Sequence, residues 1–308
     1  MTSTDWIQLI ITTRAEYAEP VGDALTAAGA QAVTVHGDDA QDVLEPPPGA
    51  TPLWDHVKIV GLFAAGTPMD PVIARLRADA GAALIGEYAV TTLADRPWER
   101  ACLDDFQPMG FGARTWVCPS WGEIPAQPDA VIIHLDPGLA FGTGSHATTA
   151  LCLEWLDAHP PVEGEVMDYG CGSGILGICA AKLGAARVWC IDYDPQALLA
   201  TRANAAHNDV AARIETRTPD QATGLRPQVL LANILAGPLM ELAPRFAAML
   251  QPGGHIVLAG LLDGQAQAVM DTYRPWVELK IDRARDGWVL LTGRRPEQDI
   301  GVVSFTVK

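Results

Sequence analysis

The chain has 308 residues, more than the usual single domain of about 100 to 200, which favours two domains and a sizeable buried core. Hydrophobic residues make up 49% and charged residues 19%, which excludes a disordered chain, while 29 Gly and 23 Pro without a period exclude a collagen-like architecture. The net charge of −16 repels phosphate backbones, so we expect no nucleic acid as a direct partner and keep a basic protein partner open.

The first third of the chain predicts a small domain of its own. Residues 1–95 follow the order strand, helix, strand, strand, helix, strand, which predicts a ferredoxin-like α+β domain. They also contain four Lys or Arg against thirteen Asp or Glu. That surface either attracts a cationic macromolecule or simply keeps a folded face solvated. The predicted elements are 6–12, 15–28, 33–36, 57–63, 69–80 and 85–93, with a loop at 38–53.

The rest of the chain has a different pattern. Residues 96–125 contain aromatic side chains without a clear period, so we interpret them as a linker. Over 126–308, short apolar strands alternate with helical stretches, which predicts an α/β domain with a mostly parallel sheet covered on both faces. Two last strands around Arg285-Asp286-Gly287 are expected to form an antiparallel edge. The predicted strands are 166–169, 187–191, 229–232, 255–259, 277–281 and 288–292.

The sequence predicts a cytoplasmic protein that has no membrane-spanning helix, no membrane partner and no metal site. A signal peptide begins with a positively charged segment, but no Lys or Arg precedes Arg14. No uninterrupted apolar stretch reaches the roughly 18 residues that a membrane span requires. The six cysteines form no CxxC pair, and several lie in apolar runs. They are therefore expected to be reduced residues of the core.

A glycine-rich loop, Asp168-Tyr169-Gly170-Cys171-Gly172-Ser173-Gly174, joins a predicted strand to a predicted helix. Gly170 and Gly172 let the backbone approach an adenosine-type cofactor at the carboxyl end of the strand, although a tight turn that binds nothing is also possible. Asp192 ends the next strand, where a carboxylate can accept both ribose hydroxyls. Asp194 could replace it, or could cap the following helix.

Asn233 distinguishes between two cofactors for this loop. The glycine spacing also matches the dinucleotide pattern of nicotinamide-dependent oxidoreductases. Asn233, however, directly follows the strand 229–232, where amino-group methyltransferases commonly keep Asn or Asp followed by two prolines and an aromatic residue. Its amide oxygen can accept a hydrogen bond from a substrate amine and aim the nitrogen lone pair at a methyl carbon. Two other functions stay as alternatives: an oxidoreductase and a methyltransferase-like interaction module. For Asn233 itself, the alternative is that it only caps a helix.

A third motif is more specific. The stretch Leu135-Asp136-Pro137-Gly138-Leu139-Ala140-Phe141-Gly142-Thr143-Gly144-Ser145-His146-Ala147-Thr148-Thr149, together with the glycine loop and Asn233-Ile234-Leu235-Ala236, resembles the PrmA family of methyltransferases. The resemblance covers most of residues 98–294. It implies a class I methyltransferase fold with a seven-stranded sheet, S-adenosylmethionine as cofactor, and an N-terminal substrate-recognition domain. The implied substrate is a basic ribosomal protein, large-subunit protein eleven, methylated on lysine and N-terminal amines.

The resemblance also implies roles for individual residues. Asn233 is the expected catalytic residue, placed at the reacting end of the pocket. Asp168 matches the acidic position beside the glycine loop, with burial against a backbone partner as its alternative. His146 is either a base or a residue that orders its loop, and we favour the second role because methyl transfer needs no strong base. The expected cofactor-binding residues are Phe141, Thr149, Asp168, Gly170, Gly172, Asp192 and Asn233.

Overall fold

The computed structural model describes residues 5–37, 54–81, 85, 87–94, 107–122, 126–136 and 144–297. The chain divides into two compact units, Met1–Ala101 and Cys102–Lys308, and each is described by itself. The predicted loop at 38–53 lies outside the described residues. The division at residues 95 and 126 stays a prediction.

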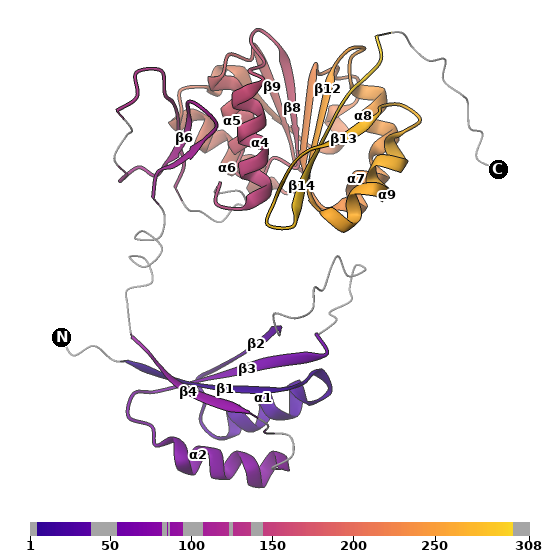
Figure 1. The fold of residues 1–308 in the computed structure, drawn as a ribbon. Coiled ribbons are helices and arrows are strands. Elements are labelled where there is room, and N and C mark those ends of the chain that lie inside the picture. Colours follow the sequence, from indigo (N-terminus) through magenta and orange to yellow (C-terminus); the bar gives the residue numbers. More distant parts are fainter. Residues whose placement is uncertain are drawn as a thin grey trace. The chain divides into compact units, whose positions relative to one another are not determined.

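The N-terminal unit is a four-stranded antiparallel sheet with two helices on one face (Figure 1). The strand order β2-β3-β1-β4 confirms the predicted ferredoxin-like arrangement. A 3₁₀ turn at Ala15–Tyr17 precedes α1, and a π-type turn at Arg77–Gly81 follows α2. The elements are β1 (Trp6–Arg14), α1 (Ala18–Ala27), β2 (Ala32–Gly37), β3 (His56–Phe63), α2 (Met69–Leu76) and β4 (Tyr88–Leu93).

Alternation along the strands builds the core of this unit. Successive side chains of a strand point to opposite faces, so Leu9 and Ile11 of β1 are fully buried while Ile10 between them is not. The buried strand residues pack against Leu25 of α1 and Leu76 of α2. The helices therefore cover one face of the sheet, and the other face is partly exposed.

The C-terminal unit is built on a seven-stranded sheet with the order β10-β9-β8-β11-β12-β14-β13. Six strands run in one direction, and β14 alone runs antiparallel, between β12 and β13, so the predicted fold class and antiparallel edge are confirmed. Strand β10, at the opposite edge, is not among the predicted strands. The strands are β8 (Glu165–Tyr169), β9 (Arg187–Ile191), β10 (Ile214–Arg217), β11 (Val229–Asn233), β12 (His255–Leu262), β13 (Leu279–Arg285) and β14 (Trp288–Arg294).

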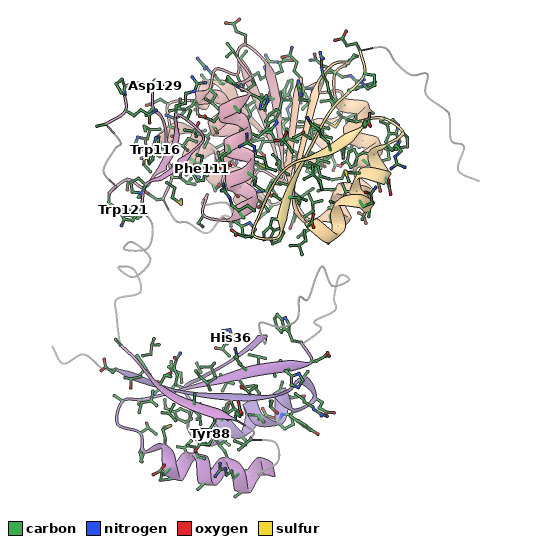
Figure 2. The ribbon with its side chains drawn as sticks, in the orientation of Figure 1. His36, Tyr88, Phe111, Trp116, Trp121 and Asp129 are labelled. Atoms are coloured by element: carbon green, nitrogen blue, oxygen red, sulfur yellow. The ribbon has the colours of Figure 1, made fainter. Side chains whose placement is uncertain are left out.

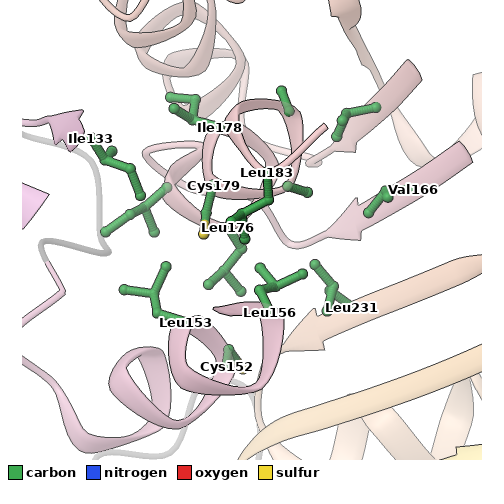
Figure 3. Packing of buried hydrophobic residues seen from close by; sticks show 14 of the residues in the cluster. Ile133, Cys152, Leu153, Leu156, Val166, Leu176, Ile178, Cys179, Leu183 and Leu231 are labelled. Atoms are coloured by element: carbon green, nitrogen blue, oxygen red, sulfur yellow. The ribbon is translucent and has the colours of Figure 1, made fainter. Parts of the chain in front are cut away.

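Helices cover both faces of this sheet (Figure 1). Val166 and Leu231 pack into one core with α4, α5 and α6, whereas their strand neighbours Met167 and Leu230 pack into a second core with α7, α8 and α9. Figure 3 shows the first of these cores, where side chains of α4 and α5 meet Leu231. The helices are α4 (Ala147–Ala158), α5 (Ile175–Lys182), α6 (Pro195–His207), α7 (Ala236–Glu241), α8 (Ala243–Met249) and α9 (Asp263–Tyr273). Short 3₁₀ turns lie at Ala211–Arg213 and Pro219–Ala222.

A three-stranded sheet corrects part of the predicted linker. Strands β5 (Met109–Phe111) and β6 (Thr115–Cys118) lie within 96–125, and β6 pairs with β7 (Val131–His134). The side chains of Phe111 and Trp116 mark this sheet in Figure 2. Asp157 of α4 stabilises the hairpin formed by β5 and β6. The Asp157 carboxylate accepts hydrogen bonds from the backbone N–H groups of residues 113–115 and from the Thr115 hydroxyl. This part of the segment is folded because a buried carboxylate 42 residues away in the sequence organises it.

Candidate functional site

The glycine loop turns sharply at the carboxyl end of β8. Gly170, Gly172 and Gly174 have φ angles of 79°, 53° and 81°, which favour glycine. The backbone N–H groups of Gly170 and Cys171 both donate to the carbonyl of Ile191, at 2.7 and 3.0 Å, so the loop is tied to the end of β9. A Cβ on Gly170 would lie 2.3 Å from Cγ2 of Ile234. The loop can therefore present bare backbone to a ligand only with glycine at these positions.

Asp192 lies beside this loop, at the end of β9. Its Oδ2 accepts from the N–H of Gly172 at 3.0 Å, and its Oδ1 accepts from the N–H of Asp194 at 3.0 Å. The residue is only 8% exposed, so the carboxylate has a fixed orientation. Each carboxylate oxygen has further lone pairs, which leaves capacity for two ribose hydroxyls. The geometry fits the predicted ribose contact.

We expect Asp192→Ala to weaken binding of S-adenosylmethionine by at least tenfold. A hydrogen bond to a charged group contributes about 1.5 to 3 kcal/mol, and the substitution also frees the N–H of Gly172. Isothermal titration calorimetry measures the dissociation constant. Asp194→Ala is the control, because its carboxylate caps α6 by accepting from the N–H of Gln196 at 2.8 Å. An unchanged dissociation constant for Asp192→Ala would remove Asp192 from the site and move the ribose contact to Asp194.

Asp168, the last but one residue of β8, lies behind the loop. It is 1% exposed, and its Oδ2 accepts from the N–H of Gly177 in α5 at 2.9 Å. Burial raises the pKa of this carboxyl to about 7; the Gly177 hydrogen bond opposes the rise and the charge of Asp192 adds to it. The structure thus places Asp168 against a backbone partner, the alternative considered for it. Its contact with the cofactor stays a prediction.

The raised pKa of Asp168 gives a stability prediction. The folded state holds a proton on this carboxyl up to about pH 7, whereas an unfolded aspartate loses it near pH 4. The contribution of Asp168 to stability therefore falls as the pH rises from about 4 to about 7. Asp168→Asn keeps an acceptor for Gly177 and removes the titration. We expect its melting temperature to rise relative to the wild type across this interval in thermal unfolding; a constant difference would contradict the shift.

Asn233 and Thr149, both predicted site residues, are brought together from distant parts of the chain. Asn233 ends β11 and Thr149 lies in the first turn of α4, 84 residues away, and Nδ2 of the amide donates to Oγ1 of Thr149 at 3.3 Å. Thr149 is 1% exposed. Within the described ranges no donor is hydrogen-bonded to Oδ1 of Asn233. The contact fixes the orientation of the amide, and the predicted role of its oxygen toward a substrate amine stays a prediction.

His146 and Asp194 have structural contacts of the predicted kind. His146 is the N-cap of α4, and its Nδ1 lies 2.8 Å from Oγ1 of Thr148 and accepts from the backbone N–H of Thr148. Its ring also meets Trp288 edge-on, with 4.9 Å between ring centroids. The residue orders the start of the helix that carries Thr149. Phe141, the remaining predicted cofactor contact, lies outside the described residues.

The sequence did not identify the residues that support the loop from α6. Oγ1 of Thr201 donates to the carbonyl of Gly172 at 3.0 Å, and Nδ2 of Asn204 donates to the carbonyl of Ser173 at 2.8 Å. The two residues lie three apart, on one face of the helix. Only the spacing of these polar residues signals the contact, and their target becomes evident once α6 is packed against the loop.

Other expectations concern cysteines, metals and membranes. Cys118, Cys152, Cys171, Cys179 and Cys190 are buried and free, which agrees with reduced core cysteines. The described part of the chain contains no cluster of three or more metal-ligating side chains. Among the residues that the structure describes, no helix is both long and apolar enough to cross a membrane.

Comparison with known proteins identifies the family of the chain. The model of the ribosomal protein L11 methyltransferase (PrmA) family matches residues 5–296. The chain belongs to this family. Membership confirms the resemblance, the methyltransferase activity and the use of S-adenosylmethionine as cofactor.

Curated relatives and a solved structure agree. Ribosomal protein L11 methyltransferase of Marinobacter nauticus is 47% identical over 297 residues, covering 95% of this chain and 99% of the relative. The ribosomal protein L11 methyltransferase of Methylococcus capsulatus is 49% identical over 291 residues, covering 94% of this chain and 99% of the relative. The crystal structure of a ribosomal protein L11 methylase from Lactobacillus delbrueckii subsp. bulgaricus superposes with a TM-score of 0.57 at 29% identity, covering 62% of this chain and 100% of that one. The similarity to both curated relatives includes the N-terminal unit of this chain.

Proposed function

We propose that this enzyme methylates amino groups of ribosomal protein L11, both lysine side chains and the N-terminal α-amine. The observation that carries the proposal is the pairing of Asn233 with Thr149 beside a glycine loop whose neighbour Asp192 is held rigidly. A glycine loop that binds nothing would need no oriented amide at the end of β11, the neighbour of β8 in the sheet. The family name given to the curated relatives supplies the identity of the substrate protein.

The residues present fit S-adenosylmethionine. Gly170 and Gly172 expose backbone at the strand end, and Asp192 faces the position of the ribose in this proposal. The proposal assigns Thr149, which accepts a hydrogen bond from Asn233, to the methionine part of the cofactor. When bound, the cofactor supplies an electrophilic methyl carbon on a positively charged sulfur, which leaves as a neutral thioether. The protein has to hold the acceptor nitrogen in line with that bond and exclude competing water.

The acceptor nitrogen must be neutral to attack. At pH 7 about one in seven α-amino groups is neutral, against about one in three thousand lysine side chains. A lysine substrate therefore needs desolvation to lower its pKa, whereas an α-amine needs little help. After Asn233 the chain continues with Ile234, Leu235 and Ala236, so it offers no aromatic ring there to stack a planar base or amide. This apolar strand end suits an aliphatic amine.

The acidic N-terminal unit is proposed to recognise the substrate protein. Residues 1–95 contain four basic against thirteen acidic side chains, which favours a basic partner such as a ribosomal protein. The larger domain, residues 126–308, holds the cofactor and the reacting amine. We place the enzyme in the cytoplasm, where newly made ribosomal proteins are available, with neither nucleic acid nor a membrane as its direct partner.

Mass spectrometry of purified ribosomal protein L11 tests the proposal. We expect incubation with the enzyme and S-adenosylmethionine to add mass in steps of one methyl group, and peptide mapping to place the additions on lysine and the N-terminal amine. A sample without cofactor is the control. Unmodified protein, or methylation confined to side chains other than amines, would contradict the proposal.

A further inference from the structure

We propose that Gly260 is a positioning residue for methyl transfer: it forms a bulge in β12 that holds the segment Asn233–Ile234 in place. The inference rests on the proposed function of Asn233. Gly260 itself needs no contact with the substrate or the cofactor. It acts by leaving room for the backbone of the residue that follows Asn233.

The bulge lies directly beside Asn233. Leu258 pairs with Leu291 of β14 and Leu261 pairs with Val289, so two residues of β12 face one residue of β14 at this point. On the other side of β12, Ala259 pairs with Asn233 in the parallel ladder with β11. Gly260 has a φ angle of 86°, in the region that favours glycine. Bulges of this kind bend a strand and redirect neighbouring groups, and they are frequent next to active sites.

The close approach of two backbones explains why the residue must be glycine. A Cβ on Gly260 would lie 2.4 Å from the carbonyl oxygen of Ile234, 2.8 Å from its carbonyl carbon and 3.0 Å from its nitrogen. All three contacts are with backbone, which cannot rotate away as a side chain can. The oxygen contact is about 1 Å shorter than an ordinary van der Waals contact. Any side chain at position 260 therefore has to displace the backbone that follows Asn233.

The same segment is confined from the opposite direction. The Cγ2 atom of Ile234 occupies the space that a Cβ on Gly170 would fill, at 2.3 Å. Ile234 thus lies between two glycines with positive φ, one in the cofactor loop and one in the bulge. Asn233 is the residue immediately before it, and its amide must meet Thr149 at the same time. The two glycines fix the height of the amide above the sheet, which the in-line geometry of methyl transfer depends on.

Gly260→Ala is the direct test, with Gly224→Ala as matched control. Both glycines have a φ angle of 86°, but a Cβ on Gly224 meets nothing within 4 Å, so the pair separates backbone strain from displacement of Ile234. We expect Gly260→Ala to lower the single-turnover rate with saturating cofactor by at least tenfold, since about 1 Å of misplacement costs on the order of a hundredfold. The dissociation constant of the cofactor should change less than about threefold. Gly224→Ala should keep the rate within about twofold.

A double-mutant cycle shows whether Gly260 acts through Asn233. In the Asn233→Ala background the amide is already lost, so adding Gly260→Ala should slow the reaction by less than about threefold. Additive losses would overturn the proposal, as would an unchanged rate for Gly260→Ala alone. An unchanged rate for Asn233→Ala would instead contradict the proposed function, so the two failures are distinguishable.

Ile234→Ala covers the case in which Gly260→Ala does not fold. It removes the contact with Gly170 and introduces no clash, which loosens the same segment. We expect a slower methyl transfer with cofactor affinity retained. A rate equal to that of the wild type would show that confinement of residue 234 is irrelevant to the reaction.

Discussion

Asn233→Ala is expected to slow methyl transfer by on the order of a hundredfold while the protein still folds. The substitution removes the amide oxygen that is proposed to accept from the substrate amine, so the amine would be free to leave its in-line orientation. It also removes the hydrogen bond to Thr149, which is 3.3 Å long and contributes little to stability. Cofactor affinity should change less than the rate, since the glycine loop and Asp192 keep their contacts.

Single-turnover kinetics with saturating cofactor isolates this chemical step. Thr149→Val is an informative companion, because it keeps the shape of the threonine and removes only the acceptor of the Asn233 amide. We expect it to give an intermediate rate. A rate for Asn233→Ala within about twofold of the wild type would show that the side chain takes no part in the chemical step, and helix capping would not explain its presence. In the structure, the N-cap position of α7 is occupied by Leu235.

The site residues that could be predicted from the sequence alone are those that lie at the carboxyl ends of parallel strands. Gly170, Asp192 and Asn233 each come at or just after the end of a buried parallel strand. Carboxyl ends of parallel strands share one edge of a sheet, so such residues meet there whatever the lengths of the helices between them. Thr149 is different. Family resemblance implied that it binds the cofactor, but its contact with Asn233 was not predicted, because no strand ends at Thr149.

The parts that sequence did not predict depend on contacts between distant segments. Residues 109–118 show no clear period because their strands are short, and the carboxylate that organises them is Asp157, in another element. Strand β10 is missed for a related reason: it is a four-residue edge strand with two charged residues. Gly260 lies inside the apolar segment that became β12, where only the approach of Ile234 shows why glycine is required.

Deleting residues 1–95 is expected to abolish methylation of intact ribosomal protein L11 and to leave cofactor binding nearly unchanged. The glycine loop, Asp192, Thr149 and Asn233 all lie in the unit Cys102–Lys308, which has its own two hydrophobic cores. The buried residues of the N-terminal unit form a separate core that includes none of these residues. The deletion should therefore remove recognition without removing chemistry.

Two measurements on the truncated enzyme separate recognition from folding. Calorimetry with S-adenosylmethionine should give a dissociation constant within about threefold of the full chain, which shows that the catalytic unit is folded. Methylation of intact ribosomal protein L11 should then be undetectable by mass spectrometry under conditions where the full chain modifies it completely. A truncated enzyme that methylates the intact protein at the normal rate would exclude the acidic unit as the recognition element. Recognition would then have to come from the unit Cys102–Lys308, which contains the proposed acceptor site at Asn233.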